Sequence, residues 1–144
     1  MSASIGIVEP KKVILSDSLT LDCGKELKEI EMVYETYGSI NENASNAVLK
    51  CNALSGNHHA AGFYAGDKRG GWWDSLIGPG KAIDTNKFFV VCPNNIGGCH
   101  GSTGPTSFNK ESGQIYGPDF PIITVRDWVK SVSYTHLRAH ETEA

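Results

Sequence analysis

Two short apolar runs are the clearest hydrophobic pattern in the chain. Residues 47–51 and 88–92 are apolar at nearly every position, whereas a half-exposed strand alternates apolar and polar side chains. Strands that are buried on both faces have this pattern, and it favours a sheet covered by helices. Roughly 35 residues separate the runs, which is enough for the crossover between parallel neighbours. We therefore expect a parallel pair, with residues 71–77 supplying one or more helical turns of the crossover.

The segments on either side have different patterns. Within the first 45 residues, 19–21 and 30–37 are rich in β-favouring side chains and are separated by glycines and polar residues, so we expect antiparallel strands in a hairpin or edge ribbon. Residues 93–121 are rich in Gly, Pro, Asn and Ser and are long for a loop, which suggests a pocket wall. Residues 124–130 predict a helix, with Thr124 as N-cap and Asp127 completing a capping box.

Composition and charge exclude several classes of function. The chain has 13 Lys and Arg against 16 Asp and Glu, a formal charge of −3 and no long basic block, so we expect no nucleic-acid partner. No segment approaches the roughly 20 apolar residues of a membrane helix, and the amino terminus has no signal-peptide pattern. We expect a cytoplasmic protein without a membrane partner, with its cysteines present as reduced thiols.

Histidine and cysteine side chains raise the question of a metal site. No C-x-x-C pair occurs, and the candidates are scattered over strand and loop positions, so we expect no metal site and histidines that hydrogen-bond locally. The glycine-rich turns also lack the spacing of a nucleotide-binding loop, and no bound cofactor is expected. The candidate metal ligands were Cys51, His58, His59, Cys92, Cys99 and His100.

Residues 52–56 are the strongest candidate for chemistry. A sharp small-residue loop after a buried strand can hold a backbone N–H in place for an oxyanion, although many ordinary connections also contain Ser and Gly. No G-x-S-x-G nucleophile elbow occurs in the chain, and we expect Ser102 to be a turn residue. Trp72 and Trp73 fit either a ligand-facing wall or packing, and we expect at least one of them to pack in the core or under a lid.

Residues 132–144 differ in character from the rest of the chain. The sequence SYTHLRAHETEA lacks both an amphipathic period and a turn into another strand. It resembles translated adapter sequence, and a frayed polar tail is the alternative. We therefore divide the chain into residues 1–131, part of one domain, and a non-native tail at 132–144, and assign no catalytic role to His136 or His140.

Four segments resemble the homoserine O-acyltransferase family, in the family's order and spacing, over nearly all of residues 5–131. That family has an α/β-hydrolase fold, and the resemblance implies that this chain is its N-terminal part, with antiparallel strands leading into a mostly parallel sheet and an end before the nucleophile elbow. The segments are VYETYGSIN at 33–41, SNAVLKCNALSGNHHAAG at 45–62, GWWDSLIGPGKAIDTNKFFVV at 71–91, and NNIGGCHGSTGPTSFNKESGQIYGPDFPIITVRDWV at 94–129.

The resemblance also implies a reaction. Members transfer an acyl group from acetyl-CoA or succinyl-CoA to the hydroxyl of L-homoserine through a Ser acyl-enzyme in methionine biosynthesis, and full-length members are usually homodimers. The backbone N–H of Leu54 would be an oxyanion donor, in a substrate-pocket loop with Asn52, Ala53, Ser55 and Gly56. The Ser, Asp and His of the triad would lie beyond residue 131, so this chain alone would be inactive.

Two alternatives and one departure accompany this interpretation. An ester hydrolase on the same scaffold would admit water to the pocket, and a non-catalytic interaction domain would keep the fold without the nucleophile. Members of the family usually carry His at the position of Asn52. Asparagine tolerates turn geometry, so we expect the loop to be retained, with an effect on the orientation of the Leu54 amide.

Overall fold

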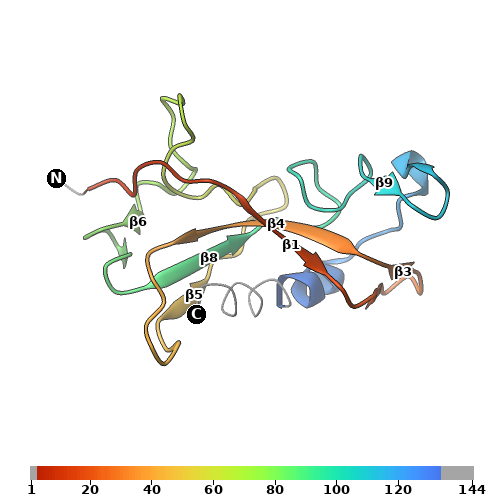
Figure 1. Cartoon of the computed structure of the whole chain (residues 1–144), viewed down its shortest axis with the longest axis horizontal. Helices are drawn as coiled ribbons and strands as arrows, with labels where there is room; N and C mark the ends of the chain where they lie inside the picture. The colour runs from red at the N-terminus through yellow and green to blue at the C-terminus, as the bar shows by residue number, and fades with distance from the viewer. Residues whose placement is uncertain (1–2, 134–144) are drawn as a thin grey trace.

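The centre of the protein is a mixed four-stranded sheet (Figure 1). The computed structural model describes residues 3–133. The strand order is β1-β4-β8-β5, in which β4 pairs antiparallel with both β1 and β8, and β5 pairs parallel with β8. The strands are β1 (Lys11–Leu15), β4 (Ile30–Tyr37), β5 (Ala47–Leu49) and β8 (Phe89–Pro93).

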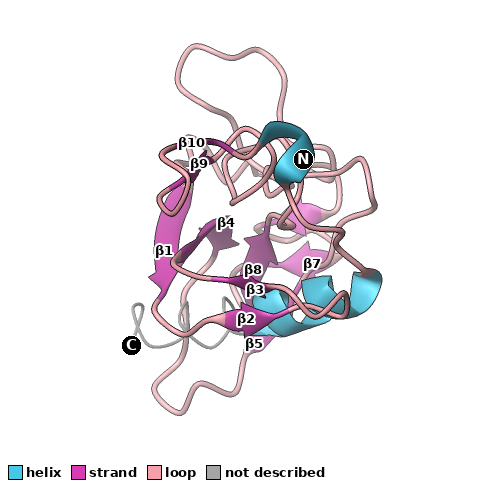
Figure 2. Cartoon of the chain, turned by 90° about the vertical axis from the view of Figure 1, so that its right-hand side faces the viewer, coloured by secondary structure: helices cyan, strands magenta, loops and turns pink. Residues whose placement is uncertain are grey.

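Small ribbons and one helix surround this sheet (Figure 2). Each ribbon consists of two strands of two residues, and a 3-10 turn, η1, occupies Gly117–Asp119. An α-helix begins at Val125 and includes the last described residue, Ser133. The ribbons pair β2 (Leu19–Thr20) with β3 (Glu26–Leu27), β6 (Ile77–Gly78) with β7 (Ile83–Asp84), and β9 (Phe108–Asn109) with β10 (Gln114–Ile115).

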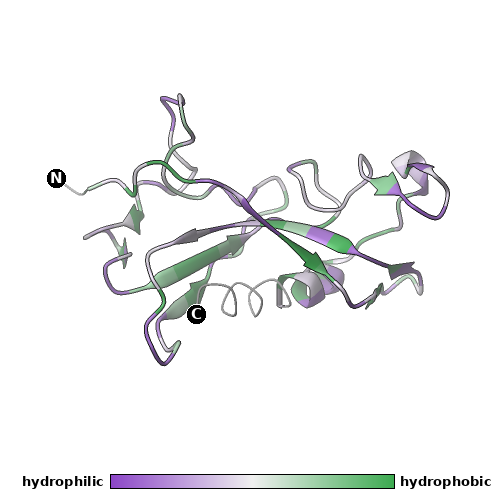
Figure 3. Cartoon of the chain, viewed as in Figure 1, coloured by the Kyte–Doolittle hydropathy of each residue, from purple (hydrophilic) through white to green (hydrophobic). Residues whose placement is uncertain are grey.

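The predicted parallel pair is confirmed. Ala47 of β5 lies opposite Phe89 of β8 in a parallel register. All five residues of β8 are buried, and Figure 3 shows this strand as mostly hydrophobic. Strand β5 is only half-buried, contrary to the expectation from its apolar run, because β8 is its only strand partner among residues 3–133 and β5 lies at the edge of the sheet.

The antiparallel start of the chain is also confirmed, with a different pairing. Strand β4 has the predicted bounds, but its antiparallel partner is β1, which the sequence analysis did not identify. Strand β2 instead pairs with β3 in a separate ribbon. The sequence of β1, KKVIL, begins with two lysines and is mostly exposed or half-buried, so its pattern is weak. These residues form a strand because they pair with the buried central strand β4.

Alternate residues of β8 enter different hydrophobic clusters. Val90 and Cys92 pack with Tyr37 and Ile77 on one face, and Phe89 and Val91 pack with other residues on the opposite face. A further cluster surrounds Leu15, Leu19, Leu27, Ile30 and Ile96, and Trp128 of the helix packs against it. Strand β8 is therefore packed on both faces, and this packing fixes the position at which the following loop begins.

The helix prediction at the end of the described chain is confirmed. Thr124 Oγ1 accepts a hydrogen bond from Asp127 N at 3.2 Å, and Asp127 Oδ2 accepts one from Thr124 N at 2.9 Å. This reciprocal pair is a capping box. Val132 continues the helix and is buried. Residues 134–144, which make up most of the expected tail at 132–144, lie outside the described residues.

The crossover between β5 and β8 contains less helix than its length allows. Trp73 O accepts hydrogen bonds from Leu76 N at 2.9 Å and Ile77 N at 3.1 Å, which makes a single turn that leads directly into β6. Within residues 3–133 the helix that begins at Val125 is the one α-helix, so helices cover little of this part of the sheet. None of the described helices is long and apolar enough to span a membrane.

Candidate functional site

A cavity lies between the loops that follow β5 and β8. These are neighbouring parallel strands, so their carboxyl ends meet at one edge of the sheet, where ligands bind in open α/β folds. The cavity has a volume of about 460 Å³. Its walls contain residues 54–56, 94–100, 120, 121, 123 and 128. The long loop after β8 therefore contributes a cavity wall, as the sequence predicted.

The loop after β5 presents Leu54 to this cavity. Leu54, Ser55 and Gly56 line it, and the Leu54 side chain is 82% exposed. Gly56 N donates to Ala53 O at 2.9 Å, which closes a tight turn around Leu54, while Leu54 N has no hydrogen-bond acceptor among residues 3–133. An unengaged amide at a cavity is what an oxyanion donor requires.

Asn52 and Ala53 support this turn without lining the cavity. A Cβ added at Gly56 would lie 2.8 Å from Asn52 Cβ and 3.2 Å from Ala53 O, so the turn is packed closely enough to require glycine. Both polar atoms of the Asn52 amide are buried and lack a partner among the described residues. The five residues predicted from the sequence thus form one turn, and the role of the Leu54 amide remains a prediction.

Asn94 supplies a polar group to the opposite wall of the cavity. It directly follows β8, is buried, and lines the cavity. Its backbone is held by a hydrogen bond from Asn94 N to Val33 O at 2.8 Å. Its side-chain Nδ2 is buried without a partner among residues 3–133. This amide was not identified from the sequence, because only its burial distinguishes it from other loop asparagines.

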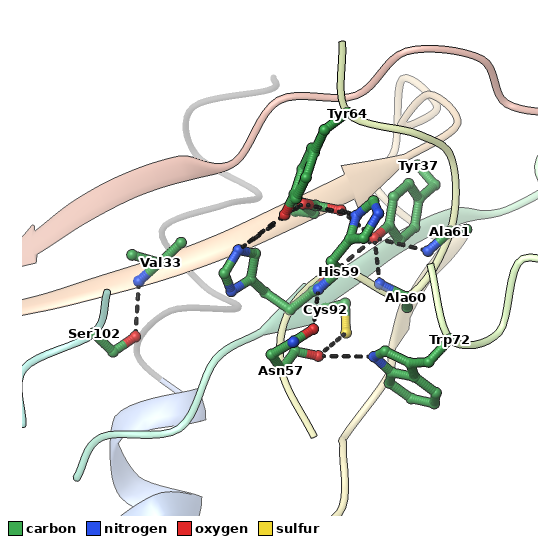
Figure 4. A network of polar contacts seen from close by, with 12 residues as sticks. Val33, Tyr37, Asn57, His59, Ala60, Ala61, Tyr64, Trp72, Cys92 and Ser102 are labelled. Carbon is green, nitrogen blue, oxygen red and sulfur yellow. Dashed lines mark hydrogen bonds and ion pairs between the residues drawn. The ribbon is translucent and has the colours of Figure 1, made fainter. Parts of the chain in front are cut away.

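The segment that follows the Leu54 turn is held by many hydrogen bonds (Figure 4). Asn57 Oδ1 accepts from His59 N at 2.9 Å, and Asn57 O accepts from Trp72 Nε1 at 3.1 Å. Trp73 packs against a core cluster, as expected for at least one of the tryptophans, and Trp72 remains partly exposed. Lys50 Nζ lies 4.1 Å from the Trp73 ring centroid, a cation–π contact.

A buried network centred on Glu35 lies behind this segment. Glu35 Oε2 accepts from Tyr37 Oη at 2.5 Å, Oε1 accepts from Tyr64 Oη at 2.5 Å, and His59 Nδ1 lies 3.1 Å from Oε2. The rings of His59 and Tyr64 stack with centroids 3.9 Å apart. Sequence reasoning missed this network, although a charged residue within the apolar strand IEMVYETY is a signal that could have identified it.

Burial and the Glu35 carboxylate both affect the pKa values of this network. Burial first, and then the hydrogen bond to Glu35 and its charge, raise the pKa of Tyr64. Burial, followed by the charge of Glu35, likewise raises the pKa of Tyr37. Burial lowers the pKa of His58, against the opposing effect of Glu35. Both tyrosines therefore remain protonated donors to Glu35 at neutral pH.

Several of the candidate metal ligands make other polar contacts. His59 and His58 lie beside Glu35, with His58 Nε2 3.9 Å from Oε1, and Cys99 Sγ lies 3.7 Å from His100 Nδ1. No group of three or more His, Cys, Asp or Glu within residues 3–133 has metal-binding geometry. All four cysteines are free thiols, and burial raises the pKa of Cys92 to about 12.

Ser102 has a structural contact in place of nucleophile geometry. It is buried, and its Oγ accepts a hydrogen bond from Val33 N at 3.0 Å (Figure 4). The neighbouring Thr103 Oγ1 accepts from Glu31 N at 2.8 Å. These two hydroxyls tie the loop after β8 to β4, which supports the prediction that Ser102 is a loop residue and not an attacking group.

Comparisons with known proteins show what this chain is similar to. No family model matches the chain. Curated relatives named homoserine O-succinyltransferase are 65% identical over 90% of the chain in Halothiobacillus neapolitanus and 60% identical over 97% in Hydrogenovibrio crunogenus. The resemblance to homoserine O-acyltransferases is confirmed. The chain spans about a third of the length of these relatives, 32% and 36% respectively.

Solved structures show the same fold. Homoserine O-acetyltransferase from Bacillus anthracis matches with a TM-score of 0.81 and 43% identity, over 90% of this chain and 36% of that one. Esterase E22 matches with a TM-score of 0.82 and 38% identity, over 92% of this chain and 38% of that one. The α/β-hydrolase fold class is confirmed, and the coverage is consistent with an N-terminal part of such an enzyme.

Proposed function

We propose that this chain is the first part of a homoserine O-acyltransferase. The complete enzyme would transfer an acyl group from an acyl-CoA to the hydroxyl of L-homoserine through a Ser acyl-enzyme. The observation that carries the proposal is the identity of 57–65% to relatives named homoserine O-succinyltransferase, over about nine-tenths of the chain. The turn at Leu54 supports it, because Leu54 lines a cavity at the carboxyl ends of β5 and β8 and its amide has no acceptor among residues 3–133.

Succinyl-CoA is the acyl donor that we propose. The two relatives described above, at 60% and 65% identity, are named succinyltransferases, whereas the solved acetyltransferase is 43% identical. In the proposed reaction, the Leu54 N–H would stabilise the negative charge that develops on the carbonyl oxygen of the acyl group. One such donor is worth about 3 kcal/mol of transition-state stabilisation. The Ser nucleophile, the His that acts as its base and the Asp carboxylate that orients this His would come from the remaining two-thirds of the enzyme.

The decisive experiment uses the full-length enzyme. Release of CoA is followed with succinyl-CoA or acetyl-CoA, each with and without L-homoserine, and the product is identified by mass spectrometry. We expect homoserine to accelerate CoA release, with O-succinylhomoserine as the main product. Release of CoA at the same rate with and without homoserine would contradict the transferase assignment.

An ester hydrolase is the second candidate function. The structural match to esterase E22 favours it, since its TM-score of 0.82 is as high as the 0.81 of the acetyltransferase to within 0.01. A hydrolase would release free carboxylic acid from an ester at a rate independent of homoserine, and the same product analysis separates the two. A non-catalytic interaction domain has no specific observation in its favour.

The remaining properties of the proposed enzyme follow from the same resemblance. We propose a cytoplasmic homodimer that uses no bound cofactor and has small-molecule substrates only. Light scattering of the full-length enzyme after size-exclusion chromatography tests the dimer, and cell fractionation tests the location.

A further inference from the structure

Glu35 is a buried charge that the proposed reaction does not use directly. Its side chain is completely buried in the middle of the central strand β4. Removal of a carboxylate from water costs several kcal/mol unless hydrogen bonds and charges compensate. An apolar residue would fill this position at lower cost. The arrangement of the groups around Glu35 indicates what the charge contributes.

The groups that contact Glu35 come from two separate segments. Tyr37 belongs to β4 itself, whereas His59 and Tyr64 belong to the loop after β5. Each carboxylate oxygen accepts a tyrosine hydroxyl at 2.5 Å, and His59 Nδ1 lies at 3.1 Å from Oε2. Hydrogen bonds to a charged acceptor are roughly twice as strong as neutral ones. The carboxylate therefore holds the loop against the sheet.

Tyr37 extends this hold to the loop backbone. Its hydroxyl donates to Glu35 and accepts hydrogen bonds from Ala60 N at 2.9 Å and Ala61 N at 3.2 Å (Figure 4). Donation to a carboxylate makes the same oxygen a better acceptor. On the other side of the loop, Trp73 N donates to Ala60 O at 2.7 Å. The backbone at residues 60–61 is thus fixed from both sides.

The Leu54 turn depends on these anchors for its position. Within residues 53–56, one hydrogen bond, from Gly56 N to Ala53 O, closes the turn, and residues 53–55 are exposed. The turn leads directly into Asn57, whose side chain caps His59 N. Its position is therefore set by β5 at one end and by the Glu35-held segment at the other.

We propose that Glu35 is a positioning residue for the oxyanion amide of Leu54. This inference rests on the proposed function, in which that amide meets the negative charge of the transition state. An oxyanion donor is effective because it is already in place and needs no reorganisation. Through Tyr37, Tyr64 and His59, the carboxylate keeps the loop in the conformation that places Leu54 at the cavity wall.

The principal test compares two identical substitutions on the same strand of the full-length enzyme. Glu35→Gln keeps the side-chain shape but replaces one acceptor oxygen with an amide NH2, so one tyrosine hydroxyl loses its acceptor on residue 35. Glu31→Gln is the matched control, because the Glu31 carboxylate is half-exposed and pairs with Lys12 at 3.3 Å on the surface. A third variant, Tyr64→Phe, removes the hydroxyl that donates to Glu35 and lies 3.3 Å from His58 Nε2, and it leaves the Glu35 carboxylate in place.

Two measurements are made on each variant. We expect Glu35→Gln to lower kcat about 10- to 100-fold per folded enzyme, with KM within about twofold, because a displaced donor loses part of the 100- to 1000-fold effect of an oxyanion contact. We also expect faster hydrogen exchange in the peptide at residues 52–62. Tyr64→Phe should show smaller changes in the same directions, and Glu31→Gln should match the wild type in both.

The outcomes separate this inference from its alternatives. A purely structural role would lower the unfolding temperature of Glu35→Gln and leave kcat per folded enzyme unchanged, which would overturn the proposal. If Glu35→Gln does not fold, Tyr64→Phe decides, and unchanged kcat and exchange in that variant would likewise overturn it. Should the wild type hydrolyse 4-nitrophenyl acetate but ignore homoserine, the transferase proposal fails, while the effect of Glu35→Gln on ester hydrolysis still tests positioning.

Discussion

At the scale of single residues, Gly71 shows how closely two backbone segments of this protein pack. The turn at Gly71 lies directly against the Glu35-held loop: a Cβ added at Gly71 would be 2.3 Å from Ala60 C and 2.3 Å from Ala61 N. Gly71 N also donates to Gly62 O at 2.9 Å. Glycine is therefore required at position 71, where the backbone packs against the backbone of Ala60 and Ala61.

We expect Gly71→Ala to destabilise the full-length enzyme by about 3 kcal/mol, the upper part of the range for overpacked sites. The new methyl group would meet backbone atoms, which cannot move aside as a flexible side chain does. Urea unfolding measures the change. Gly98→Ala is the control, because its added Cβ meets nothing closer than Asn95 O at 3.4 Å. Equal stabilities of the two variants would show that the backbone at residue 71 can move away from residues 60–61 and make room for the methyl group.

At the scale of elements, the helix that begins at Val125 shows how a local signal and a distant contact combine. Its capping box is readable from the sequence alone. Asp127 also accepts a hydrogen bond from Asp22 N at 3.0 Å, which ties the helix to a turn 105 positions earlier in the chain. The cap thus both starts the helix and docks it.

The docking hydrogen bonds predict a dependence on pH. Burial alone raises the pKa of Asp127, but the hydrogen bonds from Thr124 N and Asp22 N outweigh it, and the pKa is lowered. A carboxylate with a lowered folded pKa contributes stability above its unfolded pKa of about 3.9 and loses that contribution as the pH falls through the folded value. We therefore expect this contribution to be full at pH 7 and to be lost progressively as the pH falls below about 4.

Asp127→Asn tests this expectation in the full-length enzyme. The difference in unfolding free energy between wild type and Asp127→Asn should shrink as the pH falls below about 4. The exposed Asp119→Asn serves as control and should show a small difference at every pH. A wild-type advantage over Asp127→Asn that is independent of pH would mean that shape, and not charge, stabilises the cap.

At the scale of the whole molecule, the described part leaves apolar surface uncovered. Val125 and Val129 lie one turn apart on the helix and are 69% and 64% exposed, and nearby Ile122 is 76% exposed. Strand β5 has an unpaired edge within residues 3–133. Exposed apolar patches and open sheet edges are typical sites of association.

We expect the 144-residue chain to aggregate when expressed alone, and to be catalytically inactive. Size-exclusion chromatography with light scattering checks the first point, and the acyl-transfer assay checks the second. A soluble monomer that unfolds cooperatively would contradict the first expectation. The assignment of residues 132–144 as a non-native tail stays a prediction, which genomic reads beyond codon 131 would test.

The sequence alone determined the features that depend on local chemistry. Apolar runs located β5 and β8, and β-favouring side chains located β4. The reciprocal side-chain caps located the helix at Val125, and the small-residue loop after β5 located the Leu54 turn. Only the tertiary structure decided the pairing of β1 with β4 and the convergence of Glu35, Tyr37, His59 and Tyr64. The pairing of a strand and the burial of a charged side chain both depend on residues that are distant in the chain. A local sequence pattern carries no information about which distant residues will contact that strand or that side chain.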